Sequence, residues 1–375
     1  LKMDLEKLLF NASTRERKTT FGCINERLVI VYGIGEGYFA IKRTLLKPYG
    51  IKPAYVMDRS LPSGSEVFQG IPTLTVENLS KLENPGNYVI IVTQGNSEIF
   101  QNVKDVLEEV TAIEILWMAS FYDYVVHEPE HHSINNPELF FRTFSDEINS
   151  TYQLFDDQLS KILFEKIIAA YLGENDDSLP CQESKHQYLD ILSPGDSIGL
   201  YVGCGGFHGE TLLSILESNV DIKTAILFEP DINNFKKMVE TINYSSRVKH
   251  TNTILVPSGV YSKSGIIKIL SGMGLSTRVS DHGEPSQVVS LDDFLCNWKP
   301  DYMTIDVEGA DLHALKGASN IIKKYNPSLG VSVYHKPEHL WEIPLFLNKI
   351  CPEYRFSLRN YTGFAYETIL YARAR

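Results

Sequence analysis

The sequence of 375 residues contains few cysteines, no long apolar run and no excess of positive charge. Its five cysteines are scattered and never form a Cys-x-x-Cys pair, which excludes a disulfide framework and a cysteine-based zinc site and favours a reducing compartment. No apolar stretch approaches the roughly 18 residues that a membrane helix needs, and no signal peptide opens the chain. We therefore expect a soluble, cytoplasmic protein with no membrane span.

The charge balance is acidic, with 47 acidic and 35 basic side chains and a formal net charge of −12. Proteins that bind nucleic acids or anionic membranes present clustered lysine and arginine side chains, and no such cluster offsets the acidic charge here. We expect no nucleic-acid partner. The sequence leaves open whether the chain forms a homo-oligomer.

The length exceeds what one hydrophobic core usually supports, so two domains are expected. In both halves, short β-branched runs alternate with helical patterns, which predicts parallel sheets with helices on both faces. The fold class predicted is α/β, with two doubly wound Rossmann-like domains. We assign residues 1–120 to the first domain, 121–190 to a helical connection and 191–375 to the second domain. The periodicity predicts a helix that follows Gly37 to about Pro48 and a long helical zone from Pro137 to about Gly173. It also predicts helices over Glu210–Glu217, Leu291–Leu295 and Ala310–Lys324 and a strand over Tyr302–Ile305, with Asp292 capping the helix that it begins.

In the second half, glycines or polar side chains follow four predicted strands at the points where the strands end. These four segments are Gly203–Thr211, Glu229–Asp231, Asp306–Glu308 and His335–Lys336. The carboxyl ends of parallel strands meet at one edge of a sheet, and ligands bind in the crevice outside that edge. The pattern therefore predicts a ligand site there.

The first of these segments is rich in glycine and precedes a predicted helix near Glu210. Gly205 and Gly209 let the backbone approach a ligand closely, and the helix directs free N–H groups at it. Glu229 lies 24 residues after Gly205, the spacing of an acid that accepts hydrogen bonds from ribose hydroxyls. These features predict a nucleotide-like cofactor, and by themselves they do not exclude a dinucleotide.

The order of the motifs resembles that of FkbM-like methyltransferases over about residues 190–375. Tyr201–Leu212 is similar to their first motif, Asp-x-Gly-Ala-x-x-Gly-x-Thr, and Leu227–Asp231 to their second. Asp301–Asp311, with the sequence Asp-Tyr-Met-Thr-Ile-Asp-Val-Glu-Gly-Ala-Asp, resembles their most recognisable block. The resemblance implies a seven-stranded sheet with an antiparallel last strand, S-adenosyl-L-methionine as cofactor, and methyl transfer to an oxygen of a small-molecule or glycan acceptor, as in polysaccharide biosynthesis.

On this resemblance, His335 is the first choice of catalytic base, because an ordinary imidazole titrates near roughly pH 6.5. Asp306 is the second choice, or orients the acceptor hydroxyl. A divalent metal bound by Asp306, Asp311 and His335 is the less favoured alternative. The residues assigned to the cofactor are Gly203, Cys204, Gly205, Gly206, Gly209, Thr211, Glu229, Pro230, Asp231 and Ser258. Those assigned to the acceptor are Glu308, Tyr334, Lys336 and Arg278.

Gly203 stands where the family usually has an aspartate, so one acidic contact near the methionine part of the cofactor is missing. Two alternatives remain open, and Gly203 is the reason for the first of them. One is a non-catalytic module that binds a nucleotide or cofactor, and the other is an NAD-dependent oxidoreductase that uses one of the two glycine-rich turns.

The first half carries Gly33-x-Gly35 after a strand and Asp58 at the end of the next strand, but Tyr38 occupies the third glycine position of a dinucleotide fingerprint. This half looks like the small Rossmann-like domains of bacterial sugar-modifying proteins, which implies nucleotide or nucleotide-sugar recognition, or a scaffold. We favour a scaffold or a partner-binding role. We interpret His127, His131 and His132 as part of a solvated loop between the domains.

Overall fold

The structure is a computed structural model that describes most of the chain. The described residues are 3–14, 24, 27–47, 50–61, 67–94, 97–118, 137–172, 179–270, 278–279, 283–363 and 366–374. His127, His131 and His132 lie outside them, so their assignment to a solvated loop stays a prediction.

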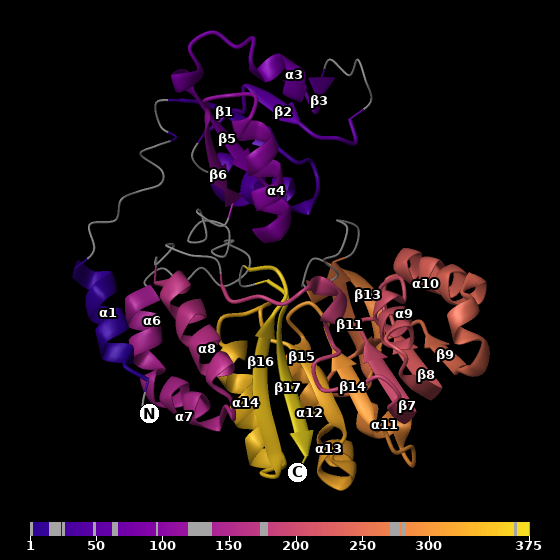
Figure 1. Cartoon of the computed structure of the whole chain (residues 1–375). Helices are drawn as coiled ribbons and strands as arrows, with labels where there is room; N and C mark the ends of the chain where they lie inside the picture. The colour runs from indigo at the N-terminus through magenta and orange to yellow at the C-terminus, as the bar shows by residue number, and fades with distance from the viewer. Residues whose placement is uncertain are drawn as a thin grey trace.

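The first sheet has four parallel strands in the order β2-β1-β5-β6 (Figure 1). Its strands are β1 (Leu28–Tyr32), β2 (Tyr55–Met57), β5 (Tyr88–Val92) and β6 (Glu114–Trp117). The apolar runs of β1 and β5 are buried, because both strands lie at the centre of the sheet and are covered on both faces. A two-stranded ribbon of β3 (Val67–Phe68) and β4 (Ile71–Pro72) stands beside this sheet.

Short helices connect the strands of this domain. They are α2 (Glu36–Ile41), a π-helix (Lys42–Leu46), α3 (Val76–Leu79), a 3-10 turn (Pro85–Asn87) and α4 (Ser97–Glu108). The helix predicted to run on toward Pro48 thus changes from α to π geometry at Lys42.

The helical zone predicted after Pro137 is three helices, α6 (Pro137–Thr143), α7 (Ser145–Leu154) and α8 (Gln158–Tyr171). The chain between α7 and α8 is extended because Asp156 N donates to Phe356 O, 3.1 Å away in the second sheet. Asp157 then starts α8 by accepting a hydrogen bond from Ser160 N at 2.8 Å.

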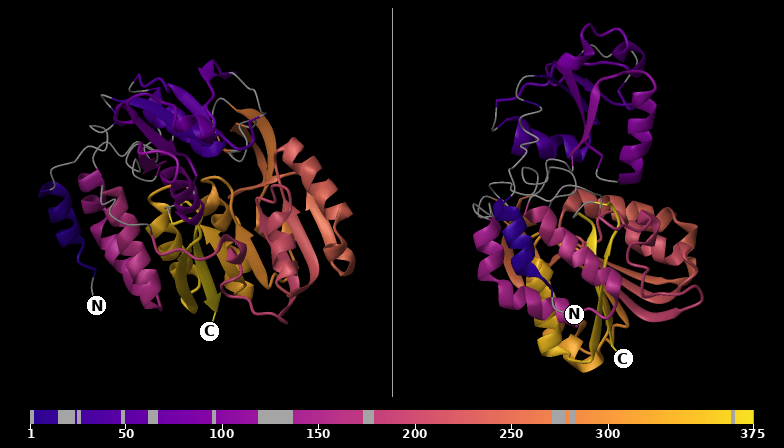
Figure 2. Two further views of the ribbon diagram at one scale, coloured as in Figure 1. Left: turned by 45° about the horizontal axis from the view of Figure 1, so that its top comes forward. Right: turned by 60° about the vertical axis from the view of Figure 1, so that its left-hand side comes forward.

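These three helices pack on the second domain, α7 against α14 and α8 against β16. The first helix of the chain, α1 (Leu5–Thr14), contacts α6, and Arg142 of α6 pairs with Glu6 at 3.2 Å. Figure 2 shows α1 beside these helices rather than beside the first sheet. The start of the chain therefore contributes to the helical layer next to the second domain.

The second sheet has seven strands in the order β16-β17-β15-β14-β7-β8-β9. Only β17 is antiparallel to its neighbours, β15 and β16. The seven strands are β7 (Ser197–Cys204), β8 (Asp221–Phe228), β9 (Asn252–Val256), β14 (Tyr302–Ile305), β15 (Ser328–Ser332), β16 (Tyr354–Asn360) and β17 (Thr368–Ala374). This confirms the predicted seven-stranded sheet, and the strand that comes last in the chain lies inside the sheet rather than at its edge.

Helices cover this sheet on both faces (Figure 1). They are a 3-10 turn (Ser184–His186), α9 (Glu210–Glu217), α10 (Ile232–Tyr244), a second 3-10 turn (Ser246–His250), α11 (Leu291–Leu295), α12 (Asp311–Lys316), α13 (Ser319–Tyr325) and α14 (His339–Ile350). A smaller sheet, in the order β10-β13-β11-β12, follows β9 in the chain. Its strands are β10 (Gly259–Val260), β11 (Gly265–Leu270), β12 (Arg278–Val279) and β13 (Glu284–Val289).

The single helix predicted over Ala310–Lys324 is broken at Gly317 into α12 and α13. The carbonyl oxygen of Tyr261 passes 2.1 Å from the place a Cβ of residue 317 would take, so this close approach of the two backbones requires glycine. Asp292 accepts hydrogen bonds from the first N–H groups of α13, those of Asn320 and Ile321. Asp292 therefore caps α13 and not α11, the helix that it begins and that the sequence predicts it to cap.

Among the described helices, none combines the length and the apolar character that crossing a bilayer requires.

Candidate active site

The glycine-rich turn lies between β7 and α9 and packs against the ends of two neighbouring strands. Gly205 has φ +86°, and a Cβ at this position would lie 1.8 Å from the backbone oxygen of Asp306. Both Gly205 N and Gly206 N donate to Phe228 O, at 3.1 and 2.8 Å. Gly209, with φ +91°, is the N-cap of α9. The close approach of two backbones, together with the left-handed φ, therefore requires glycine at 205.

Glu229 follows β8 and joins this turn to the start of α10. Its carboxylate accepts hydrogen bonds from Phe207 N and Asp231 N, each at 2.9 Å, and only 4% of the residue is exposed. Burial raises the pKa of Glu229 to about 7, although the two N–H groups favour the ionised form. A carboxylate accepts up to about four hydrogen bonds, so Glu229 retains acceptor capacity for a ligand beside the turn.

Two residues assigned to the cofactor, Gly203 and Cys204, lie in β7 rather than in the turn. A Cβ at 203 would lie 2.8 Å from Leu227 Cδ2 and 3.1 Å from the Tyr201 hydroxyl. That hydroxyl is hydrogen-bonded to Thr304 Oγ1 at 2.6 Å. The space next to residue 203, where the family usually has an aspartate, is thus filled by neighbouring side chains.

Several other residues assigned to the cofactor have structural partners. Asp231 caps α10 by accepting from Asn233 N and Asn234 N at 2.9 and 3.0 Å, and Ser258 donates to Gln287 O at 3.0 Å. Pro230 packs near Gly259, and Thr211 lies in the first turn of α9. Their contact with a cofactor stays a prediction.

A cluster of charged side chains gathers beyond the ends of β14 and β15. His335 Nε2 lies 3.3 Å from Asp306 Oδ1 and 3.5 Å from Glu308 Oε2. On the other side of the ring, His335 Nδ1 lies 3.0 Å from Asp311 Oδ2. The predicted catalytic pair, His335 and Asp306, is therefore brought together, with two further carboxylates beside it.

Asp311 is the fully enclosed member of this cluster, with no exposed side-chain surface. It accepts hydrogen bonds from Val307 N and Gly309 N, at 3.0 and 3.1 Å, in addition to its contact with His335. Burial opposes its ionisation, but the charge on His335 and these hydrogen bonds hold the pKa of Asp311 below its usual value. Asp311 therefore acts as an anchor for the loop 307–309 and for the imidazole ring.

The electrostatics of His335 differ from those of an ordinary imidazole. Burial alone would lower its pKa, but Asp311, Glu308 and Asp306 raise the pKa of His335 to about 10. With a pKa in that range the ring carries a positive charge at neutral pH and does not serve as a base. Burial and the neighbouring carboxylates raise the pKa of Glu308 to about 8, and burial also raises that of Asp306. Asp306 therefore becomes the candidate proton acceptor, because a carboxyl with the pKa of Glu308 is mostly protonated at neutral pH.

Tyr188 is a site residue that the sequence patterns did not indicate. Its hydroxyl donates to Asp306 Oδ2 at 2.9 Å and lies 3.0 Å from Ser332 Oγ. Two other tyrosines hold its backbone, since Tyr371 OH accepts from Tyr188 N and Tyr302 OH donates to Tyr188 O. The residue stands 118 positions before Asp306 in an irregular segment, so only the tertiary structure reveals its role.

The residues assigned to the acceptor are partly brought to this cluster. Glu308 faces His335, and the ring of Tyr334 lies with its centroid 4.2 Å from that of His335. Tyr334 OH donates to Glu367 Oε1 at 3.3 Å, and the Lys336 side chain passes over Gly309. The backbone of Arg278 lies in β12, and its side chain is outside the described part of the structure.

Residues of the first domain itself contact the backbone of its glycine-rich turn. Asp58 Oδ2 accepts from Ile34 N at 2.9 Å, and a Cβ at Gly37 would lie 1.9 Å from Thr93 O. Tyr38 is fully buried and packs edge-on against Phe68. This arrangement favours the scaffold interpretation of the first domain.

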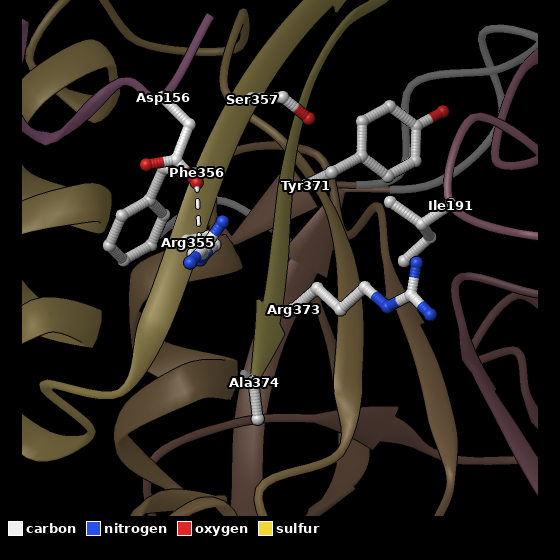
Figure 3. Close-up of a pocket in the computed structure, with 8 residues that line it drawn as sticks. All are labelled: Asp156, Ile191, Arg355, Phe356, Ser357, Tyr371, Arg373 and Ala374. Carbon is white, nitrogen blue, oxygen red and sulfur yellow. Dashed lines mark ion pairs between the residues drawn. The ribbon is translucent and has the colours of Figure 1, made fainter.

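A pocket of about 500 Å³ lies away from the cluster, between β16, β17 and the segments that carry Asp156 and Ile191 (Figure 3). Arg355 lies opposite Arg373 in the sheet, near the amino ends of the parallel strands, and pairs with Asp156 at 3.8 Å. The charged cluster lies at the carboxyl ends of the strands. The pocket is therefore at the opposite edge of the sheet from the predicted site.

Comparison with protein families shows that residues 204–360 match the Methyltransferase FkbM domain. That segment begins at the end of β7 and includes Glu229, Asp306, Glu308, Asp311 and His335. No curated protein matches the chain.

Among solved structures, the methyltransferase FkbM from Methylobacillus flagellatus KT is similar over 98% of this chain and 99% of its own, with a TM-score of 0.68 and 15% sequence identity. The fold is thus shared over almost the whole length, the first domain included. A Streptococcus pneumoniae protein solved with S-adenosyl-L-methionine matches 52% of this chain and 73% of its own, at 15% identity and a TM-score of 0.33. A methyltransferase from Geobacter sulfurreducens matches 48% and 71%, at 11% identity and a TM-score of 0.29.

Proposed function

We propose that this protein is an S-adenosyl-L-methionine-dependent O-methyltransferase that acts on a hydroxyl of a saccharide or glycoconjugate intermediate. The observation that carries the proposal is the match of residues 204–360 to a methyltransferase domain, with the glycine turn, Glu229 and the charged cluster all inside that segment. The turn and Glu229 would hold the cofactor, with the ribose hydroxyls donating to the Glu229 carboxylate. The charged cluster beyond β14 and β15 would receive the acceptor.

The reaction requires little covalent chemistry from the protein, because a sulfonium group is already an activated methyl donor. The acceptor oxygen forms the new bond to the methyl carbon as the carbon–sulfur bond breaks. The electron pair of the broken bond stays on sulfur, which becomes a neutral thioether. The hydroxyl proton passes to a carboxylate of the cluster. Asp306 is our first choice, because its side chain is 26% exposed while both nitrogens of His335 face carboxylates. His335 and Tyr188 then position Asp306.

Calorimetry on the full chain with S-adenosyl-L-methionine, S-adenosyl-L-homocysteine and NAD tests this proposal. We expect both sulfur cofactors to bind and NAD to bind at least a hundredfold more weakly. Binding of NAD alone would show that an oxidoreductase is the better assignment. Tight binding of S-adenosyl-L-homocysteine without methyl transfer to any saccharide would favour the non-catalytic module. The filled space beside Gly203 is the observation that supports this alternative.

Replacement of the acid after β8, Glu229→Ala, is expected to weaken binding of the cofactor by about a hundredfold. The variant removes the acceptor of the ribose hydroxyls and also frees Phe207 N, and hydrogen bonds to a charged group contribute about 1.5–3 kcal/mol each. Calorimetric titration measures the change. Glu217→Ala, which removes an exposed carboxylate at the far end of α9, is the matched control and should bind as the wild type does. Equal affinities in all three proteins would remove Glu229 from the cofactor site.

The raised pKa of Glu229 predicts that cofactor affinity depends on pH. Because ribose hydroxyls donate to the ionised carboxylate, the cofactor prefers the deprotonated form, which is lost as the pH falls through about 7. Between pH 8 and pH 6 we expect affinity to fall by roughly tenfold, since about nine tenths of the carboxyl is protonated at the lower value. Glu229→Gln should remove this dependence while leaving any that arises from the ligand's own amino group. The same slope in both proteins would contradict the assignment.

The proposal places the reaction in the cytoplasm, on the ground of the scattered cysteines. The first domain is proposed as a scaffold or a partner-binding unit. Its resemblance to domains of sugar-modifying proteins stays a prediction.

A further inference from the structure

One atom of the charged cluster is buried without a hydrogen bond. The side chain of His335 is only 8% exposed, and its Nε2 has no hydrogen-bond partner in the described part of the structure. A buried polar atom normally has such a partner, because its desolvation otherwise costs about 1–3 kcal/mol. The atom points between two carboxylate oxygens, Asp306 Oδ1 at 3.3 Å and Glu308 Oε2 at 3.5 Å.

Nε2 forms a hydrogen bond with neither oxygen, and the two separations are close to the spacing of neighbouring ligands around a metal ion. Two ligand atoms that bind an ion at about 2.1 Å and at right angles lie about 3 Å apart.

The geometry points to a divalent-cation site formed by His335 Nε2, Asp306 Oδ1 and Glu308 Oε2. One imidazole and two carboxylates suit a first-row transition ion such as Mn²⁺ better than they suit Ca²⁺. The two carboxylates follow β14 and the histidine follows β15, so the ligands come from adjacent strand ends.

The remaining groups of the cluster orient these ligands. Asp311 holds Nδ1 of His335 at 3.0 Å, which turns Nε2 toward the site, and Tyr188 OH binds Asp306 Oδ2, which leaves Oδ1 toward the site. An oxygen of Asp306, an oxygen of Asp311 and a ring nitrogen of His335 also lie within 4.8 Å of one another. We nevertheless place Asp311 outside the ligand set, because its oxygens are already bound to Val307 N, Gly309 N and the ring. It corresponds to the carboxylate that typically orients a metal-bound histidine.

The backbone at Glu308 supports the same conclusion. Glu308 has φ +51° and is followed by Gly309 with φ +88°, a conformation that costs a non-glycine residue about 1–3 kcal/mol. This conformation directs the Glu308 side chain to the same nitrogen as Asp306. Both carboxylates remain partly exposed, 26% and 30%, so solvent and an acceptor reach the site.

The part of an ion in catalysis rests on the proposed function. An ion held there would supply positive charge that favours the ionised form of an acceptor hydroxyl, and the proton acceptor would remain the Asp306 carboxylate. Binding of the ion itself does not depend on the cofactor and is measured without it.

The test uses the full chain, freed of metal with a chelator, and Mn²⁺ alone as the probe. Loss of the free-ion electron paramagnetic resonance signal gives stoichiometry and affinity, and spin-echo modulation reports nitrogen from a coordinated imidazole. We expect one Mn²⁺ per chain with nitrogen coupling. Glu308→Gln and Asp306→Asn should each bind Mn²⁺ at least tenfold more weakly. Asp311→Asn, which retains the three ligands, should lose 10–100-fold in Mn²⁺ affinity. Circular dichroism verifies that each variant is folded.

Glu342→Gln is the matched control, because it removes a negative charge of α14 that does not belong to the cluster. Its Mn²⁺ affinity should equal that of the wild type. The inference is overturned if folded wild-type protein takes up no Mn²⁺ at millimolar concentration, if the bound ion shows no nitrogen coupling, or if the ligand variants bind as tightly as Glu342→Gln. Metal uptake without cofactor binding would uphold this inference while the proposed function fails. Cofactor binding without metal uptake would overturn this inference and leave the proposed function standing.

Discussion

Gly205→Ala is expected to destabilise the second domain by about 3–5 kcal/mol and to abolish cofactor binding. The substitution places a methyl group 1.8 Å from the carbonyl oxygen of Asp306, a backbone atom that cannot rotate away. It also puts a side chain at φ +86°, which costs about 1–2 kcal/mol for an L-residue. Thermal unfolding followed by circular dichroism should show a midpoint lowered by roughly 10 °C.

Gly195→Ala separates the two causes of this effect. Gly195 has a similar φ of +93°, but nothing lies within 4 Å of the place its Cβ would take. We therefore expect this variant to lose only about 1–2 kcal/mol. Equal stability of the two variants would contradict the close contact between the turn and the residue that follows β14.

Asp306→Asn is expected to reduce methyl transfer by about 10²–10⁴-fold while changing cofactor affinity by less than threefold. The amide keeps the size of the side chain and can still accept a hydrogen bond from Tyr188, but it neither takes a proton nor carries the charge opposite His335. The magnitude is that of a lost general base. The assay is transfer of a labelled methyl group from S-adenosyl-L-methionine to saccharides extracted from the source organism, with cofactor binding followed by calorimetry.

Asp221→Asn is the control for this experiment. Asp221 is exposed and starts β8, so it lies at the amino end of a parallel strand, the opposite edge of the sheet from the cluster. Its replacement should leave methyl transfer unchanged. Loss of activity in Asp306→Asn together with an equal loss of cofactor affinity would show that Asp306 serves the cofactor and not the acceptor.

The elements that the sequence predicted best are those with continuous apolar runs or clear caps. Helices Glu210–Glu217 and Leu291–Leu295 and strand Tyr302–Ile305 have the predicted bounds. The errors are helices that were expected to continue, at Phe155–Asp157 and at Gly317. In both places the interruption comes from a backbone hydrogen bond or a backbone contact with a distant segment, and local periodicity contains no trace of it.

The candidate site was predictable in its position and only partly in its chemistry. The sequence placed Asp306, Glu308 and His335 at strand ends that the sheet indeed brings to one edge, because the carboxyl ends of adjacent parallel strands must meet. It interpreted His335 as an ordinary imidazole base. The structure surrounds that ring with three carboxylates, which raise its pKa to about 10.

By itself, the sequence determined the alternation of strands and helices, the glycine turn and the acids and histidine that end the strands, since each follows from local periodicity or conformational freedom. Only the tertiary structure decided which nitrogen of His335 faces Asp306 and Glu308, that Asp311 lies behind the ring, and that Tyr188 reaches the cluster from a distant segment. The physical reason is that charge interactions depend on distances of a few ångströms between residues far apart in the chain, and on how much water burial removes from around them.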